Sequence, residues 1–150
     1  MLARIRKAQE ENEGGFTLIE LLVVMIIIGI LAAIAIPVFL SQRAKAQDAA
    51  VKGDVSTVGK ELATYYVDNT AVPTLTLSGS GRYVLTSTDV PAGQDLGKAS
   101  NNVVLGTGTS IVDDTHWCVA LNNPKGDKKA YKYSAKGGLS AGACGAADVS

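Results

Sequence analysis

Excess charge of either sign is missing from this sequence, and aromatic side chains are scarce. Its 150 residues include 14 basic and 14 acidic side chains, so the formal net charge is zero, and only 5% of the residues are aromatic. Proteins that bind nucleic acids through the phosphates carry a basic excess or a basic stripe. The sequence shows neither, and we predict no direct nucleic-acid binding.

The residue types that build most catalytic and metal sites are also few. The chain has a single histidine, His116, so no nucleophile–base arrangement can be selected among its many hydroxyl side chains. Metal sites need clusters of ligands, and the spacing of Asp95, Asp113 and Asp114 does not match a calcium loop. We predict no enzyme activity, no catalytic residue, no metal site and no cofactor.

Cysteine is limited to Cys118 and Cys144, both in the C-terminal third. An even pair in an exported domain favours a disulfide over two buried free thiols. The bond would close a loop of about 25 residues and stabilise the fold by about 3 kcal/mol.

Charge is absent altogether from Leu21 to Leu40, a run of 20 residues. This is the length that a helix needs to cross a bilayer, and its apolar residues lie nearly all round the helix. Residues 1–15 before it are polar and charged, without a hydrophobic period, which is typical of a processing segment.

One carboxylate, Glu20, lies at the start of this apolar region. An ionisable residue in a membrane helix costs about 3 kcal/mol and usually marks function. It could reach the membrane interface or relay protons, but no second ionisable residue follows within the helix. A cut after Gly15 would free an amino group on Phe16, four residues away. Because buried ion pairs specify register better than they add stability, we interpret Glu20 and Phe16 as an assembly contact, preferably between neighbouring chains.

The stretch Gly15-Phe16-Thr17-Leu18-Ile19-Glu20, followed by the apolar run, resembles the class III signal sequence of type IV pilins and pseudopilins. The resemblance implies cleavage after Gly15 and N-methylation of Phe16 by the same membrane peptidase. It also implies a role for Glu20 in assembly. Pro37 falls where this family carries a helix-melting proline, and with Gly29 it marks a stretch expected to unwind in a filament.

The resemblance also implies partners and a location. These are further copies of the chain in a helical filament, a prepilin peptidase and methyltransferase, a membrane platform protein, an assembly ATPase and minor pilins. The precursor would sit in the cytoplasmic membrane as a single-pass protein with its N-terminus inside, and the assembled pilus would be extracellular. Charge alone does not decide the orientation, because basic residues flank both ends of the apolar run; the resemblance and the cysteines favour N-in.

Downstream of the apolar run, helical periodicity continues on one face. Apolar residues recur at three and four positions from Val51 to Tyr65, which predicts an amphipathic half of one helix spanning 16–67. Asp68-Asn69-Thr70 and Pro73 end it. Beyond residue 74, short β-type runs predict strands, at 83–87, 103–105, 110–112, 117–121 and 130–134.

The last two predicted strands form a hairpin around the turn Asn122–Asp127, and each is expected to have two different faces. Gly79–Asn102 is expected to be mostly loop. The predicted fold is α+β: a long N-terminal helix packed on a small antiparallel β-sheet head. The predicted regions are a leader (1–15), a transmembrane or filament-core half-helix (16–40) and a head (41–150), with its half-helix (41–67) and sheet region (about 74–150).

Three functions compete. The first is a structural subunit of a type IV pilus; the second is a pseudopilin of a type II-like secretion or DNA-uptake system. The resemblance implies that major pseudopilins of secretion systems often lack a disulfide and carry a calcium loop. The paired cysteines and the missing calcium loop of this sequence therefore favour the pilin. The third is a monomeric exported binding domain, because Ala33-Ile34-Ala35 can mimic an ordinary secretory cleavage box. Pro37 and Glu20 argue against it.

Overall fold

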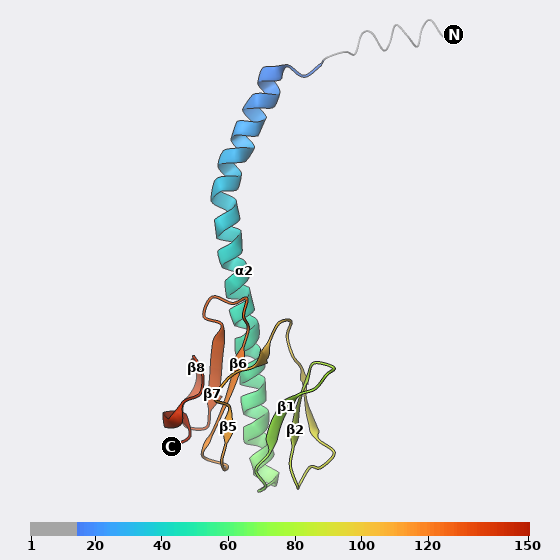
Figure 1. Cartoon of the computed structure of the whole chain (residues 1–150), viewed down its shortest axis with the longest axis vertical. Helices are drawn as coiled ribbons and strands as arrows, with labels where there is room; N and C mark the ends of the chain where they lie inside the picture. Colours follow the sequence, from blue (N-terminus) through green and yellow to red (C-terminus); the bar gives the residue numbers. More distant parts are fainter. Residues whose placement is uncertain (1–14) are drawn as a thin grey trace, which may run out of the picture. The chain divides into compact units, whose positions relative to one another are not determined.

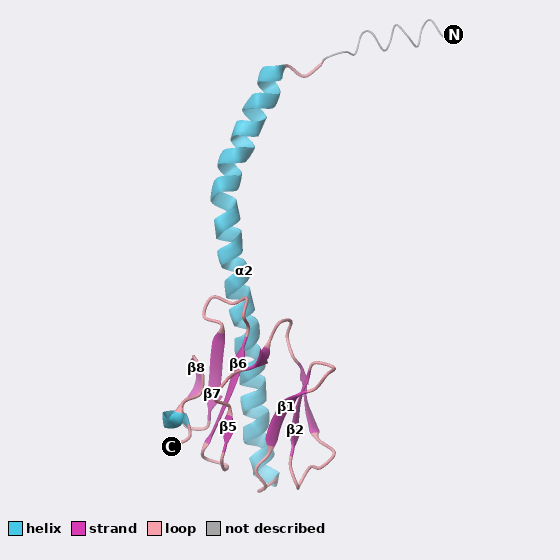
Figure 2. Cartoon of the chain, in the orientation of Figure 1, coloured by secondary structure: helices cyan, strands magenta, loops and turns pink. Residues whose placement is uncertain are grey.

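The computed structural model describes residues 15–150, so positions 1–14 of the predicted leader lie outside the described residues. The chain divides into two compact units, Met1–Phe39 and Leu40–Ser150. One helix, α2 (Leu18–Asp68), contributes residues to both (Figures 1 and 2). It begins two residues later and ends one residue later than the sequence predicts.

The described part of the first unit is the apolar half of α2. Every residue from Leu18 to Phe39 is exposed except the half-exposed Ala32. Within residues 15–150, α2 is the one helix long and apolar enough to cross a membrane, with a mean hydropathy of 3.1 over its most apolar window and none of that window buried. The helix is continuous through Gly29 and Pro37. Unwinding of that stretch in a filament stays a prediction.

The second unit contains the amphipathic half of α2. Val51, Val55, Val58 and Leu62 are fully buried and Tyr65 is 2% exposed, which confirms the predicted apolar face. Gly59 is needed for close packing, since a Cβ there would lie 2.5 Å from Cγ of Tyr133.

Two antiparallel sheets form the rest of this unit, where the sequence suggested one small sheet. The first has the order β1-β2-β3, and the second has the order β4-β6-β7-β8, with β5 also pairing with β6. The strand bounds are β1 Thr74–Leu77, β2 Arg82–Thr86, β3 Gln94–Lys98, β4 Val104–Leu105, β5 Ser110–Ile111, β6 Trp117–Asn122, β7 Ala130–Ser134 and β8 Gly138–Ala141, followed by a short 3-10 helix, η1 Ala146–Asp148.

Five strands were predicted within about one residue of their bounds, and three were missed. β1, β3 and β8 lie at sheet edges, and β3 has a single buried residue, Leu96. Because strand preference depends on packing against neighbours, such strands have a weak sequence signal. Most of Gly79–Asn102 is loop, as predicted, but the segment also contains β3, which the sequence analysis did not predict.

The β6–β7 hairpin is confirmed, with Val119 opposite Tyr133 and Leu121 opposite Tyr131. The prediction of two different faces for β6 is confirmed, although Trp117–Leu121 are all buried. One face packs on the core shared with α2. On the other face, a Cβ added to Gly106 would lie 3.0 Å from Ala120. Cys118, also on this face, is covered by Cys144, to which it is joined by a disulfide.

Candidate assembly segment and the contacts that shape the head

The N-terminus of α2 is closed by a reciprocal pair of residues, Thr17 and Glu20. Oε2 of Glu20 accepts hydrogen bonds from the backbone N of Thr17 (2.8 Å) and from its hydroxyl (2.7 Å). The backbone N of Glu20 donates to Oγ1 of Thr17 at 3.2 Å. This is a capping box, in which each side chain satisfies a free backbone N–H of the first helical turn.

The capping box changes the interpretation of Glu20. A carboxylate in the first helical turn also interacts favourably with the helix dipole, so Glu20 has a local structural role besides any role in assembly. The sequence signal was a threonine followed three residues later by glutamate before an apolar run, and our sequence analysis missed it. Both hydrogen bonds that Thr17 donates to the Glu20 side chain go to Oε2.

The predicted cleavage position precedes this cap. Residues 15–17 are not helical, Phe16 is 89% exposed, and no atom would lie within 4 Å of a Cβ added to Gly15. A protease needs an accessible segment outside regular structure, and the exposed, non-helical residues 15–17 are compatible with cleavage there. The structure thus places Gly15, Phe16 and Glu20 at one exposed helix end, with Gly29 and Pro37 farther along the same helix.

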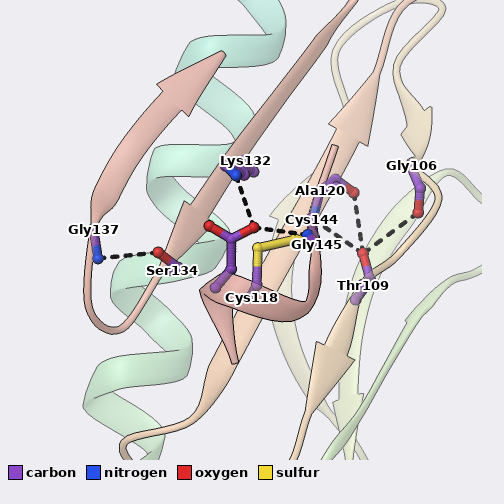
Figure 3. The surroundings of a disulfide bond; sticks show 10 residues. Gly106, Thr109, Cys118, Ala120, Lys132, Ser134, Gly137, Cys144 and Gly145 are labelled. Carbon is purple, nitrogen blue, oxygen red and sulfur yellow. Dashed lines mark hydrogen bonds and ion pairs between the residues drawn. A yellow bond between two sulfur atoms is a disulfide. The ribbon is translucent and has the colours of Figure 1, made fainter. Parts of the chain in front are cut away.

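A disulfide joins Cys118 of β6 to Cys144, with the two Cα atoms 5.9 Å apart (Figure 3). A second tie lies beside it: Nζ of Lys132 donates to Oδ2 of Asp148 at 2.7 Å, and the backbone N of Gly145 donates to the same oxygen at 2.7 Å. These two hydrogen bonds hold the pKa of Asp148 below its usual value, and the bond from Lys132 has the larger effect. The C-terminal segment is therefore fixed to the five-stranded sheet at two points.

Two of the three acidic residues considered for calcium, Asp113 and Asp95, have other partners. Oδ1 of Asp113 accepts hydrogen bonds from the backbone N of Thr115 (2.9 Å) and of His116 (2.7 Å), and Asp113 also pairs with the His116 ring. These hydrogen bonds lower the pKa of Asp113 to about 2, and the bond from the backbone of Thr115 has the largest effect. Asp95 pairs with Arg82. Within residues 15–150 no group of three or more candidate ligands is close enough to hold a metal ion.

Two acids on α2 position the loops of the head, and sequence analysis did not single them out. Asp54 accepts hydrogen bonds from the Tyr83 hydroxyl (3.0 Å) and from the backbone N of Ser100 (2.7 Å). Burial, and then the charge of Asp54, raise the pKa of Tyr83. Asp48 is 6% exposed and accepts hydrogen bonds from loop backbone, as described below. The sequence signal that could have identified Asp48 and Asp54 was the position of an acidic residue next to the apolar face of the helix.

Comparisons with known proteins match only parts of the chain. A family model described as the prokaryotic N-terminal methylation motif matches residues 12–36. The chain is 42% identical over 65 residues to the type II secretion system core protein G of Pseudomonas aeruginosa, covering 43% of this chain and 46% of that protein. It is 34% identical over 82 residues to the protein of the same name from Dickeya chrysanthemi, covering 55% and 53%.

A relative with a pilus name also matches. The chain is 47% identical over 58 residues to the type IV wide pilus major component PilA4 of Thermus thermophilus, covering 39% of this chain and 44% of that protein. The chain thus spans about half the length of the curated relatives it matches. No solved structure matches it. The methylation motif, these relatives and the long helix packed on antiparallel sheets all support the type IV pilin and pseudopilin family.

Proposed function

We propose that this protein is a structural subunit of a type IV pilus, made as a membrane-anchored precursor. It is cleaved after Gly15, methylated on Phe16, and assembled into a filament through the N-terminal half of α2. In this proposal the chain has no enzyme activity of its own. It is the substrate of a prepilin peptidase and methyltransferase, and it works with a platform protein, an assembly ATPase and minor pilins.

The observation that carries the proposal is the fully exposed apolar half-helix. Soluble proteins rarely expose large contiguous apolar surfaces, and those that do so use them to meet a membrane or another protein. The exposed residues run along α2 from Leu18 to Leu40, and most of their large side chains are 46–81% exposed. Lipid covers this surface in the precursor, and the same half of neighbouring chains covers it in the filament.

Small residues support exchange of lipid for neighbouring helices. Helix association in a membrane depends on close contact rather than on hydrophobic transfer, and glycine and alanine allow that contact. Gly29 has no atom within 4 Å of the position of a Cβ, so its surface is open to a neighbouring helix. Ala32, Ala33 and Ala35 follow within two turns.

A pseudopilin is the second candidate, and the two relatives named as secretion core protein G favour it. The disulfide and the lack of a candidate metal cluster in residues 15–150 favour the pilin. The capped helix end and exposed apolar half suit both. The two candidates differ in whether the protein reaches the cell surface in long filaments.

The experiment is an intact mass measurement, with N-terminal sequencing, of protein sheared from cells. The pilus proposal predicts a chain that begins at Phe16, carries one added methyl group and lacks two hydrogens for the Cys118–Cys144 bond. Correct processing with nothing in the sheared fraction indicates a pseudopilin. A chain that begins at Ile36 overturns both and leaves an exported monomeric domain.

A further inference from the structure

An open hollow lies on the head where α2 enters it. Leu40, Arg43, Ala44 and Gln47 line it from the helix, and Lys125 lines it from the turn between β6 and β7; its volume is 390 Å³. The four helix residues are spaced by three and four positions, so they share one face. The volume falls in the range of small-ligand sites, about 300–1,000 Å³.

The turn that supplies Lys125 is fixed to α2 by buried polar contacts. Asn123 is fully buried, and its Nδ2 donates to Oε1 of Gln47 at 2.7 Å. The backbone N of Lys125 donates in turn to Oδ1 of Asn123 at 3.1 Å. The backbone of Lys125 is therefore held beside the helix face that carries the other lining residues.

Asp48 fixes the far end of the same turn. Its Oδ2 accepts a hydrogen bond from the backbone N of Lys128 (2.9 Å) and its Oδ1 accepts one from Lys129 (3.1 Å). Figure 1 shows this β6–β7 turn running beside α2. Both carboxylate oxygens of Asp48 are thus used within the fold, and the hollow has a fixed wall.

The hollow is positively charged. Arg43 and Lys125 are exposed, and in the described part of the chain neither forms an ion pair. Lys128 and Lys129 follow in the same turn, with Asp127 as its one exposed acid. An anion placed between Arg43 and Lys125 would meet two uncompensated cations.

The position of Arg43 along α2 indicates which class of anion would reach the hollow. Charge is absent from Leu21 to Leu40, and Arg43 follows three residues later, about 4.5 Å farther along the axis. In a membrane-anchored chain this is the depth of the lipid headgroups, where basic side chains meet anionic lipids.

We propose that the hollow binds the phosphate of an anionic phospholipid headgroup while the chain is anchored in the membrane. Arg43 and Lys125 contact the phosphate, and Leu40 faces the first carbons of the lipid chains. The inference rests on the membrane-anchored precursor proposed above.

The test uses the full chain in nanodiscs made from equal amounts of phosphatidylglycerol and phosphatidylcholine. Native mass spectrometry of the released protein counts the retained lipids of each class. We expect phosphatidylglycerol to be enriched on the wild type. In the Arg43→Gln/Lys125→Gln variant the enrichment falls by about fivefold for each cation removed.

The matched control is Lys60→Gln/Lys98→Gln, which removes the same charge from exposed positions outside the hollow and should keep the enrichment. Ala44→Phe fills the hollow and keeps both cations, and it should lose the enrichment; Ala44→Leu is a smaller change with the same expected direction. Disulfide content and circular dichroism check that each variant is folded.

Three results would overturn the inference. One is an equal loss in the control variant, which would show a diffuse effect of net charge. Another is unchanged enrichment in the Arg43→Gln/Lys125→Gln variant, which would show that these two cations do not bind the lipid. The third is no enrichment on an inserted wild-type chain. A chain that fails to enter nanodiscs would instead contradict the membrane-anchored precursor itself.

Discussion

Thr17 and Glu20 satisfy each other's hydrogen-bonding groups at the start of α2, through three bonds of 2.7–3.2 Å. Two of the bonds converge on Oε2 of Glu20, so the carboxylate is oriented before any other chain approaches. The residue expected to specify assembly register is thus also the residue that caps the helix. Substitutions at the two positions separate these roles.

Replacement of Thr17 by alanine should loosen the first turn of α2. An N-cap change to alanine costs about 1 kcal/mol, which corresponds to roughly fivefold faster hydrogen exchange at the amides of the first turn. Thr17→Ser keeps the hydroxyl and should exchange at the wild-type rate. Exchange measured on the full chain in detergent checks this, and equal rates in all three proteins would contradict the capping box.

Replacement of Glu20 by glutamine should keep most of the cap and remove the charge. The amide oxygen still accepts hydrogen bonds from Thr17, so we expect hydrogen exchange near the wild-type rate. If Glu20 pairs with the amino group of Phe16, the variant should be cleaved normally and yield at least tenfold fewer filaments. A tenfold loss corresponds to a subunit contact weakened by about 1.4 kcal/mol. Immunoblots of sheared and cellular fractions measure both, and undiminished filaments would contradict the assembly role.

Two glycines of α2 should respond in opposite directions to alanine. Gly59→Ala places a Cβ 2.5 Å from Cγ of Tyr133, and such overpacking costs about 1–3 kcal/mol. Gly53→Ala meets no atom within 4 Å and should stabilise the helix by up to about 1 kcal/mol. Denaturant unfolding of the processed chain in detergent gives both values, and a stabilised Gly59→Ala variant would contradict the packing described here.

Loss of the disulfide should lower the free energy of unfolding by about 3 kcal/mol. The bond closes a loop between residues that are 26 positions apart in the sequence. The Cys118→Ala/Cys144→Ala variant should unfold at lower denaturant, and exchange should rise first in residues 142–150. The Lys132–Asp148 pair is retained in this variant, so the C-terminal segment keeps one of its two ties. Unchanged exchange there would show that the disulfide does not hold the segment.

Acid should weaken the head through Asp113. Its pKa is lowered from 3.8 to about 2 in the folded state, so the folded form binds the proton less readily than the unfolded form. The stabilisation is present above pH 3.8 and is lost as the pH falls towards about 2. Asp113→Asn should unfold more easily at neutral pH and lose less between these pH values than wild type. Thermal unfolding across that range, with Asp114→Asn as the matched neighbour, measures the difference.

The sequence predicted the features that depend on local pattern. The uncharged run from Leu21 to Leu40, the stripe from Val51 to Tyr65 and the β6–β7 hairpin each follow from the periodicity of residues a few positions apart. The capping box was also readable, because Thr17 and Glu20 are separated by three residues. These features depend on short-range geometry, which a helix or a strand repeats in the same way in any protein.

Other features required the tertiary structure. The division into two sheets depends on edge strands such as β3, whose few apolar residues give little pattern. The role of Asp48 depends on backbone amides 80 and 81 residues away, and the basic hollow depends on Lys125 meeting the helix face of Arg43. The amino-acid sequence by itself determined the uncharged apolar run, the methylation motif and the helix that carries them, because these are local. Only the tertiary structure decided which polar groups meet across the head, because such pairs depend on how distant segments pack.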